Sequence, residues 1–530
     1  MTLNPIVGSV YDTLTTIQTT FNLHSVLTLS EDEPGLRLKL ADAATHAENL
    51  ASAIRQCINR LAPIYRLPDE LLIRIFEEHI KDPSGHNWAE ARLLALVSRR
   101  WRLLAINTPA LWTCISFTPF ENIEIPESYV QRSGEYPIEV NFACWAATPA
   151  SYNELASALR VLYTCVARMR RLQISDMAPK LLQWLLPRLD RMHALSLTHV
   201  SLHNNAGILD LKEPCPFVSG CYSPAIRSLE VAGIRLSNRQ IPLNLRALTS
   251  LTLGDEEATK PMIDHSAFHQ LLSSTPQLTR LIIRNSAVHF HADGLTKAVC
   301  LPALHTLIFR GNASRHFCEY QFLASLSAPS LARLELSECL TRFGEYRDPT
   351  PQFMDGANQP KFPLAQRFYV GRKFYNPQHV PLFILGLPHV THVSIAVEHL
   401  KYLSKELAKM VAGRPAFATT AAWGQLQSLR VQYRPEIRIP DNALCDWLAV
   451  RRDVPGLPPL KIIIHASGVD AVDSPVRITG SQWQWVRNLT ARGAEVTFEE
   501  IEVVQFLDCE AGICKPPHCA VHTRELHRYS

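Results

Sequence analysis

The sequence has little net charge and no long apolar run. It contains 53 lysines and arginines against 49 aspartates and glutamates, a formal charge of +4 over 530 residues, and no basic tract. This balance argues against a nucleic-acid-binding surface. No apolar run approaches the ~20 residues needed to cross a bilayer, and residues 1–27 lack the features of a signal peptide. We therefore expect no nucleic-acid partner, no membrane partner, and a cytoplasmic or nuclear location.

The motifs of common enzymes are also missing. There is no glycine-rich phosphate loop, no G-x-S-x-G, no H-E-x-x-H and no kinase signature. The histidines, such as His203, His265 and His269, are dispersed, which is typical of solvated or locally bonded side chains. We predict no enzyme activity, no catalytic residues and no cofactor. A hydrolase in an unfamiliar α/β fold remains the alternative.

Cysteine is present without a pairing pattern. Thirteen scattered cysteines, an odd number, indicate reduced thiols. Near the end, "CEAGICKPPHCAVH" (509–522) could supply four zinc ligands from Cys509, Cys514, Cys519 and either His518 or His522. It lacks the C-x-x-C knuckle, so we predict a loose tail over 506–530 and no bound metal.

The first periodic pattern predicts one long helix. Residues 1–35 are rich in threonine, end in "SEDEPG" and are predicted to be flexible. Residues 36–62 place apolar side chains at alternating steps of four and three, which predicts an amphipathic helix ended by Pro63. The stripe fits a coiled-coil dimer or a helix packed on its own chain, and its central alanines favour the second. It consists of Leu36, Leu40, Ala43, Ala47, Leu50, Ile54, Cys57 and Leu61.

Residues 63–118 hold two shorter helical patterns and a strand. In "LPDELLIRIFEEHI" (67–80), Pro68 occupies the first turn, and two acidic residues follow at the positive end of the helix dipole. Its apolar residues come in adjacent couples, which predicts a wide apolar face. A second helix is expected after "KDPSGHN", with three arginines (Arg99, Arg100, Arg102) mostly opposite its apolar side, and then a strand over 113–117.

These patterns carry a family resemblance. "YRLPDELLIRIFEEHI" followed by "LLALVSRRWRLLAINTPALWTCISF" resembles the F-box-like domain in the form abundant in fungal proteins. In that form a helix and an "APIxxLPxE" entry also precede the domain, which matches Ala62-Pro63-Ile64 here. Two features depart from the family pattern: Ser98, where cysteine is frequent, and a longer polar insert between the helices.

The resemblance implies a partner and a role. F-box domains bind a Skp-type adaptor of a cullin complex, so it implies a substrate receptor of an SCF-type ubiquitin ligase with an unknown protein substrate. The alternative is a non-catalytic binding scaffold whose F-box-like helices only cap the following repeats. The positions that match the motif also give this small unit an excess apolar face, as expected of a partner site. They are Leu67, Pro68, Leu71, Leu72, Ile75, Phe76, Val97 and Trp101.

Residues 119–505 contain an internal repeat. Fragments such as "IRSLEV", "LTRLII" and "LARLEL" fit L-x-x-L-x-L, often after a proline, and step by roughly 22 to 36 residues with one gap near 60. A short strand of this kind buries its apolar side only when neighbours stack beside it. We predict an α/β fold: the helical F-box-like domain, then an irregular leucine-rich-repeat-like solenoid with a curved parallel sheet. The central residues are Leu172, Leu195, Leu229, Leu251, Leu281, Leu307, Leu334, Val393 and Leu429.

The alternation of strand side chains also predicts a binding face. The leucines point inward, so the residue between the last two and the one after should face solvent. Three arginines in this set favour an acidic or phosphorylated target. The predicted substrate-binding residues are Glu230, Thr252, Ile282, Arg284, Ile308, Arg310, Glu335, Arg430 and Gln432.

Overall fold

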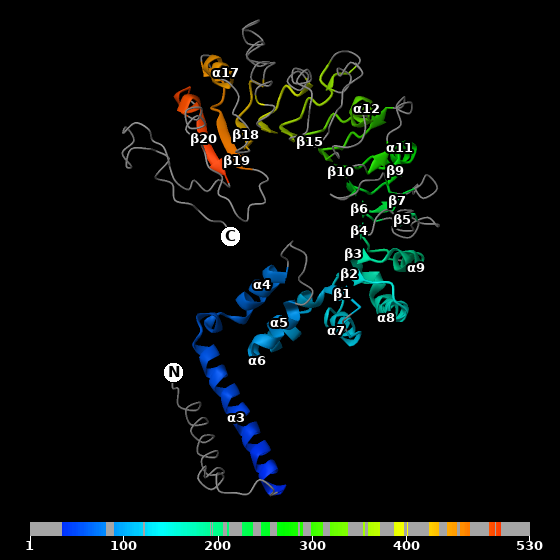
Figure 1. Cartoon of the computed structure of the whole chain (residues 1–530), viewed down its shortest axis with the longest axis vertical. Helices are drawn as coiled ribbons and strands as arrows, with labels where there is room; N and C mark the ends of the chain where they lie inside the picture. The colour runs from blue at the N-terminus through cyan, green and yellow to red at the C-terminus, as the bar shows by residue number, and fades with distance from the viewer. Residues whose placement is uncertain are drawn as a thin grey trace. The chain divides into compact units, whose positions relative to one another are not determined.

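Figure 1 shows a computed structural model of the chain, which divides into two compact units, Met1–Val140 and Asn141–Ser530. The described residues are 34–80, 90–119, 122–190, 192, 194–204, 209–210, 225–236, 245–254, 262–284, 287–289, 298–310, 318–337, 353–355, 359–371, 386–396, 400, 423–433, 443–452, 456–466, 487–492 and 494–499. The tail over 506–530 and most of the segment 1–35 lie outside this part of the chain. The flexibility expected of them therefore stays a prediction.

The first unit is mainly helical. The carbonyl of Pro68 accepts the first hydrogen bond of the domain's leading helix, 3.2 Å from the Leu72 amide, so the proline lies just before that helix and its missing N–H has no cost. The predicted strand is present. The elements are α3 (Pro34–Leu61), η1 (Pro63–Arg66), α4 (Asp69–Ile80), α5 (Glu90–Val97), α6 (Arg99–Ile106), η3 (Pro109–Trp112), β1 (Cys114–Phe117) and α7 (Glu124–Arg132).

The second helix expected from the sequence is in fact two helices, α5 and α6, because Ser98 interrupts it. Ser98 has an extended backbone, and its Oγ accepts a hydrogen bond from the Trp101 amide at 3.2 Å. This is an N-cap, which satisfies one of the amides that a new helix leaves unpaired. The apolar residues before and after Ser98 therefore do not share one helical face.

The predicted stripe of α3 is covered only in part where its exposure is described. Leu40, Ala47, Ile54 and Leu61 are exposed, whereas Ala43 and Leu50 are half-buried. The favoured interpretation, a helix packed on its own chain, is therefore wrong at the four exposed residues. A periodicity of four and three fixes which side of a helix is apolar, but it does not say what covers that side.

The second unit is built on a parallel sheet. From β3 onward its strands run in the order β3-β4-β6-β8-β10-β13-β15-β16-β17-β18-β19-β20, and every neighbouring pair is parallel. They are part of a sheet of 14 strands in the described part of the chain. Within this unit the strands follow an arc (Figure 1). Those after β1 are β2 (Ile138–Trp145), β3 (Met169–Met177), β4 (His199–His203), β6 (Ser228–Ala232), β8 (Ser250–Leu253), β10 (Arg280–Arg284), β13 (Thr306–Arg310), β15 (Arg333–Ser337), β16 (Arg367–Val370), β17 (His392–Ala396), β18 (Ser428–Tyr433), β19 (Lys461–Ala466) and β20 (Glu495–Glu499).

Helices and three small two-stranded sheets occupy parts of the connections between these strands. None of the helices in the described part of the chain has the length and apolarity to cross a membrane. The further elements are α8 (Pro149–Cys165), η4 (Val166–Arg168), α9 (Pro179–Asp190), α11 (His265–Ser273), α12 (Cys318–Ser325), α17 (Ala443–Arg452) and the pairs β5 (Leu209–Asp210) with β7 (Ile234–Arg235), β9 (Ile263–Asp264) with β11 (Val288–His289), and β12 (Val299–Cys300) with β14 (Leu326–Ser327).

The central leucines align in one buried row. Leu281 pairs with Leu251 on one side and Leu307 on the other, and Leu307 pairs with Leu334, all in register. These four side chains are fully buried. The stacking in sequence order that the repeats predicted is therefore confirmed for these strands.

The prolines that precede several of the strands belong to short hydrogen-bonded turns. The amide of Leu278 donates to the carbonyl of Thr275, and the same three-residue return closes Leu301–Leu304 and Ala328–Leu331. Each turn holds a proline as its second residue ("TPQL", "LPAL", "APSL"). Proline suits this position because its ring fixes the φ angle that the turn needs. The turn brings the chain to the start of the next strand.

Two details of the repeat register differ from the expectation. Leu195 is exposed and precedes β4, whose inward residue paired with Leu229 is Val200. The gap near 60 residues is filled by β16, where Phe368 pairs with Leu334 and Val393. Valine and phenylalanine fill the same buried row as leucine, so a search for leucine alone shifts one repeat and misses another.

Candidate functional site

In each of the two apolar couples of α4, Leu71-Leu72 and Ile75-Phe76, the second residue is buried in the core of the F-box-like segment. Leu72 and Phe76 are 0% and 1% exposed, and the Phe76 ring packs on Trp101 with centroids 4.7 Å apart. The expectation that these two side chains lie partly in solvent was therefore wrong. Residues four apart share a helical face, so the stripe through 72 and 76 faces inward.

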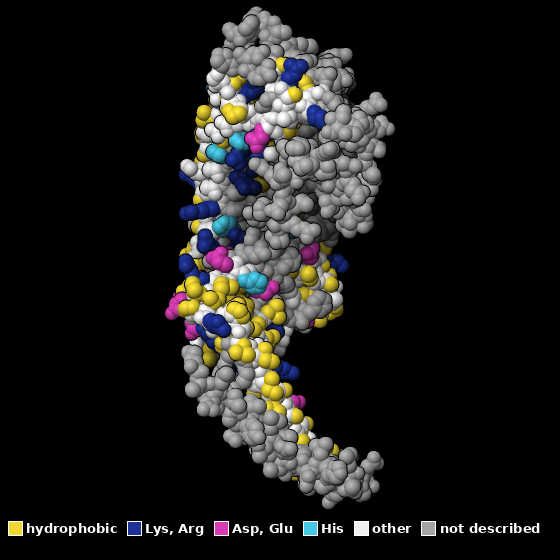
Figure 2. Space-filling model, turned by 90° about the vertical axis from the view of Figure 1, so that its left-hand side faces the viewer, with side chains coloured by type: hydrophobic (Ala, Val, Ile, Leu, Met, Phe, Trp, Pro, Cys, Tyr) yellow, Lys and Arg dark blue, Asp and Glu magenta, His cyan; other side chains and the backbone are white. Residues whose placement is uncertain are grey.

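The first residue of each couple is exposed to solvent. Leu71 and Ile75 are 45% and 46% exposed, and Val97 on α5 is 52% exposed. Figure 2 shows hydrophobic side chains gathered over the helical unit. Three exposed leucines on α5 and α6 were not predicted as site residues. We call the set of Leu71, Ile75, Leu93, Leu96, Val97 and Leu103 the helical apolar surface.

Arg100 fixes the entry to this domain. Its guanidinium donates to the carbonyls of Tyr65 and Leu67, both at 2.6 Å, and pairs with the Asp69 carboxylate. The same group lies 5.3 Å from the centre of the Tyr65 ring. The sequence placed this arginine on a solvated side. It instead ties α6 to the segment that holds Leu67 and the exposed Pro68, two of the predicted adaptor positions.

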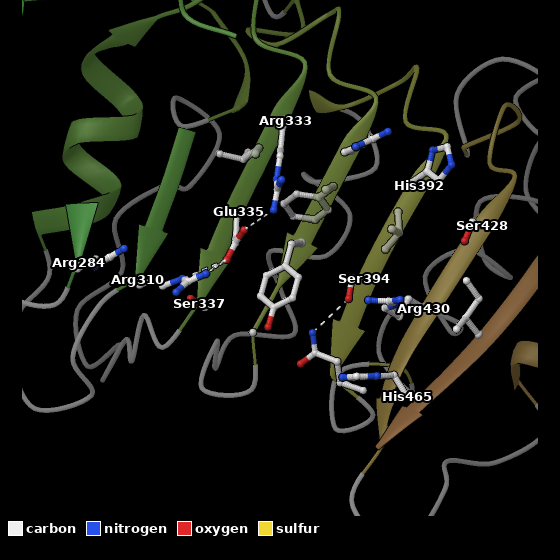
Figure 3. Close-up of a pocket in the computed structure, with 18 residues that line it drawn as sticks. Arg284, Arg310, Arg333, Glu335, Ser337, His392, Ser394, Ser428, Arg430 and His465 are labelled. Carbon is white, nitrogen blue, oxygen red and sulfur yellow. Dashed lines mark hydrogen bonds and ion pairs between the residues drawn. The ribbon is translucent and has the colours of Figure 1, made fainter. Parts of the chain in front are cut away.

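The repeat unit presents a different kind of site. A hollow of about 890 Å³ lies on one face of the sheet, lined by residues from β10 to β19. Figure 2 shows arginine, lysine and histidine side chains along this unit, and Figure 3 shows the hollow in detail. We call it the cationic groove. Its charged lining consists of Arg284, Arg310, Arg333, Arg367, Arg430, His392, His465 and one carboxylate, Glu335.

Glu335 is the centre of an ion-pair cluster on one side of the groove. Its side chain is only 5% exposed, and its two oxygens accept from Arg310 at 3.2 Å and from Arg333 at 3.1 Å (Figure 3). Ion pairs of this kind offset part of the cost of removing a carboxylate from water. The cluster holds two guanidinium groups in place and leaves an excess of positive charge around it.

The predicted substrate-binding residues divide between the groove and the interior. Arg284, Arg310, Glu335, Arg430 and Gln432 line the groove, and Glu230 pairs with Arg284 at 3.7 Å. Five of the nine, however, are buried rather than solvent-facing: Thr252, Ile282, Ile308, Glu335 and Gln432. On a strand, residues two apart share a face, and the long stems of arginines can cover apolar neighbours such as Ile282 between Arg280 and Arg284.

Several groove residues were missed, and three of them share one strand position. Arg333, Arg367 and His392 each precede the inward residue of their strand and face the same side as the residue after it. The two-residue period of a strand could have identified them, because the position before the central leucine lies on the same face as the position after it. Burial and the neighbouring Arg367 charge lower the pKa of His392.

A second polar cluster lies around Glu230. The hydrogen bond with His203, supported by the Arg284 charge, holds the pKa of the Glu230 carboxyl below its usual range. Ser201 also lies there, with its Oγ 2.8 Å from Nε2 of His203. That same Nε2 faces Glu230 at 3.6 Å. A serine-histidine-acid relay needs the two partners on opposite ring nitrogens, so this geometry does not form one.

No group of three potential metal ligands occurs within the described residues. The cysteines and histidines of segment 509–522 lie outside them, so the zinc alternative stays untested there.

Comparison with known families identifies the first unit. A family model described as F-box-like matches residues 64–118. This segment is an F-box-like domain. The search of curated proteins found no match. An F-box-like domain suggests an adaptor-binding role of the SCF type, and proteins with such domains are generally non-catalytic adaptors.

Proposed function

We propose that the chain is the substrate-receptor subunit of an SCF-type cullin ubiquitin ligase. It binds a Skp-type adaptor through the F-box-like domain and a target protein through the repeat sheet. The observation that carries the proposal is the helical apolar surface on the domain matched to the F-box-like family. Six large aliphatic side chains in solvent on so small a unit are typical of an interface.

The two stripes of α4 have separate tasks. Leu72 and Phe76 hold the helices together, while Leu71 and Ile75 project from the same helix into solvent. An adaptor can therefore cover the outer stripe without opening the core. Arg100 supports this surface by fixing the chain that enters α4.

The decisive experiment separates binding from folding. In the full chain, the double change Leu71→Ala, Ile75→Ala should abolish pull-down of a purified Skp-type adaptor, because each interface anchor contributes about 2 kcal/mol, roughly thirtyfold in affinity. The thermal melt should remain that of the unmodified chain, since both side chains are already half in water.

Two controls complete the experiment. Leu72→Ala, Phe76→Ala should unfold the domain as well as lose the adaptor, because both side chains lie in the core. Leu195→Ala removes an exposed leucine from the repeat unit and should change neither property. Adaptor binding that survives the Leu71→Ala, Ile75→Ala change would contradict the proposal. A chain that binds no adaptor at all would favour the capping scaffold.

A further inference from the structure

We propose that the cationic groove binds a phosphorylated segment of the target protein, with Arg333, Arg367 and Arg430 around the phosphoryl group. This inference rests on the proposed function, because it names the class of target that the repeat sheet receives. It starts from the arrangement of charge on adjacent strands.

Arginines lie directly beside arginines in this sheet. In register, Arg333 of β15 is the neighbour of Arg367 of β16. Arg284 and Arg310 form another such pair. Like charges at directly opposite positions destabilise a sheet. The ion pairs with Glu335 and Glu230 offset part of this repulsion, and a bound anion would offset more of it.

The single carboxylate of the lining does not neutralise these charges. Glu335 forms ion pairs with Arg310 and Arg333, and no acidic side chain in the described part of the chain pairs with Arg367. The Glu335 carboxylate instead orients two guanidinium groups before a ligand arrives. Preorganised charge of this kind lowers the cost of binding, because the side chains are already ordered.

The residues between the arginines are polar. Tyr369 of β16 lies in register between Glu335 of β15 and Ser394 of β17, and Ser337 and Gly371 complete this part of the lining. The Ser394 hydroxyl oxygen accepts a hydrogen bond from Gln432 at 3.1 Å, so its own hydrogen can be donated to a ligand. In Figure 3, Glu335 with its two arginines lies on one side of Ser394 and Arg430 on the other. An anion above Ser394 would have guanidinium groups on both sides.

A phosphoryl group matches this charge better than a carboxylate. At neutral pH it carries about −1.5 to −2 and three strong acceptor oxygens, against one unit of charge for an acidic side chain. Arginine forks bind phosphate through paired hydrogen bonds. Five arginines line the hollow against one carboxylate, which is more positive charge than a single aspartate or glutamate would need.

The length of the groove favours a peptide over a small free phosphate compound. Its lining comes from β10, β13, β15, β16, β17, β18 and β19. At about 4.8 Å between neighbouring strands, this span is roughly 29 Å, which an extended segment of about nine residues would cover. Arg284 and His465 lie near the two ends and would contact residues flanking the phosphorylated one.

The test uses the full chain bound to its adaptor and three degenerate nonapeptide libraries with a central phosphoserine, serine or glutamate. We expect the phosphoserine library to bind at least tenfold more tightly than either other library. Arg367→Gln and Arg430→Gln should each remove at least about tenfold of this affinity. Arg280→Gln is the matched control, because Arg280 is an exposed arginine at the same strand position as Arg333 but outside the lining. It should have no effect.

Further ligands and a further variant distinguish the other possible outcomes. Equal binding of the serine and phosphoserine libraries would overturn the proposal, and equal binding of the glutamate library would show an acidic target instead. Binding of inositol hexakisphosphate without selection for phosphopeptides would show a small polyphosphate site and also overturn it. Arg430→Lys keeps the charge and loses the fork, so it should weaken binding less than Arg430→Gln; this comparison remains informative if a glutamine variant misfolds.

Adaptor pull-down from the same preparations separates the two levels of the inference. Retained adaptor with no phosphopeptide selection refutes only the target class. Phosphopeptide selection without any adaptor binding refutes the ligase role and leaves the groove as a phosphopeptide-binding site.

Discussion

Leu307→Ala is the sharpest test of the repeat register. Leu307 lies in the middle of the buried row, paired in register with Leu281 on one neighbouring strand and with Leu334 on the other. All three are fully buried. Replacing Leu307 therefore removes a side chain from between two layers that cannot move together without breaking the sheet hydrogen bonds.

The expected loss follows from the atoms removed. The change deletes three side-chain carbons, about 2.4 kcal/mol of transfer free energy at ~0.8 kcal/mol for each buried methylene. The space left behind adds a cavity term, and measured leucine-to-alanine losses reach 2 to 5 kcal/mol. A parallel sheet with a neighbour on each side collapses poorly, so we expect the loss to exceed the transfer term alone.

Hydrogen exchange measured by mass spectrometry is the assay, because a chain of two units need not unfold in one step. If exchange proceeds through opening of the sheet, amides in Thr306–Arg310 should exchange roughly thirtyfold to several thousandfold faster in the variant. His305→Ala alters an exposed side chain just before the same strand and should stay within about 0.5 kcal/mol. A loss below half a kilocalorie in Leu307→Ala would mean that the inward register is wrong.

Two further predictions concern buried titratable groups. Lys361 donates to the carbonyls of Leu323 and Ala324 near the end of α12, and burial lowers its pKa from 10.5 to about 8. Between these two pH values the unfolded chain therefore binds more protons than the folded chain. The free energy of unfolding, measured relative to Lys361→Met, should rise with pH from about 8 to 10.5. Parallel stability curves for the two proteins over that window would refute this account. Burial raises the pKa of Cys165 to about 11, whereas Cys144 and Cys300 are exposed, so iodoacetamide should modify the last two and spare Cys165 in the folded chain. Peptide mass spectrometry measures this, and rapid modification of Cys165 would show that α8 does not pack as described.

The repeat sheet could be predicted because its signal is local. The L-x-x-L-x-L fragments place apolar residues two apart, which only a strand with one buried face requires. The repeats at Val200 and Phe368 were misplaced or missed because the buried row accepts any large apolar side chain. A search for leucine alone is therefore narrower than the requirement of the fold, which is a large apolar side chain at each buried position.

The F-box-like surface shows a different limit. The sequence reveals the couples Leu71-Leu72 and Ile75-Phe76, but their order does not say which member faces the core. That depends on Trp101, which packs on Phe76 from another helix, and on the break at Ser98 that sets the direction of that helix. The roles of Arg100 and Glu335 were hidden for the same reason. Arg100 bonds to partners more than 30 positions away, and Glu335 depends in part on Arg310, which lies 25 positions away.

The in-register row has a consequence for how such a chain can change. From Leu229 to Leu251 the chain advances 22 residues, and from Val393 to Leu429 it advances 36, yet both pairs meet in the same register. The register of the sheet therefore does not depend on the length of the connection between two neighbouring strands. Insertions and deletions between strands can accumulate, or a tag can be spliced in, without shifting a single residue of the binding face. A lineage of such proteins can lose all recognisable spacing and still present side chains from neighbouring strands in aligned rows.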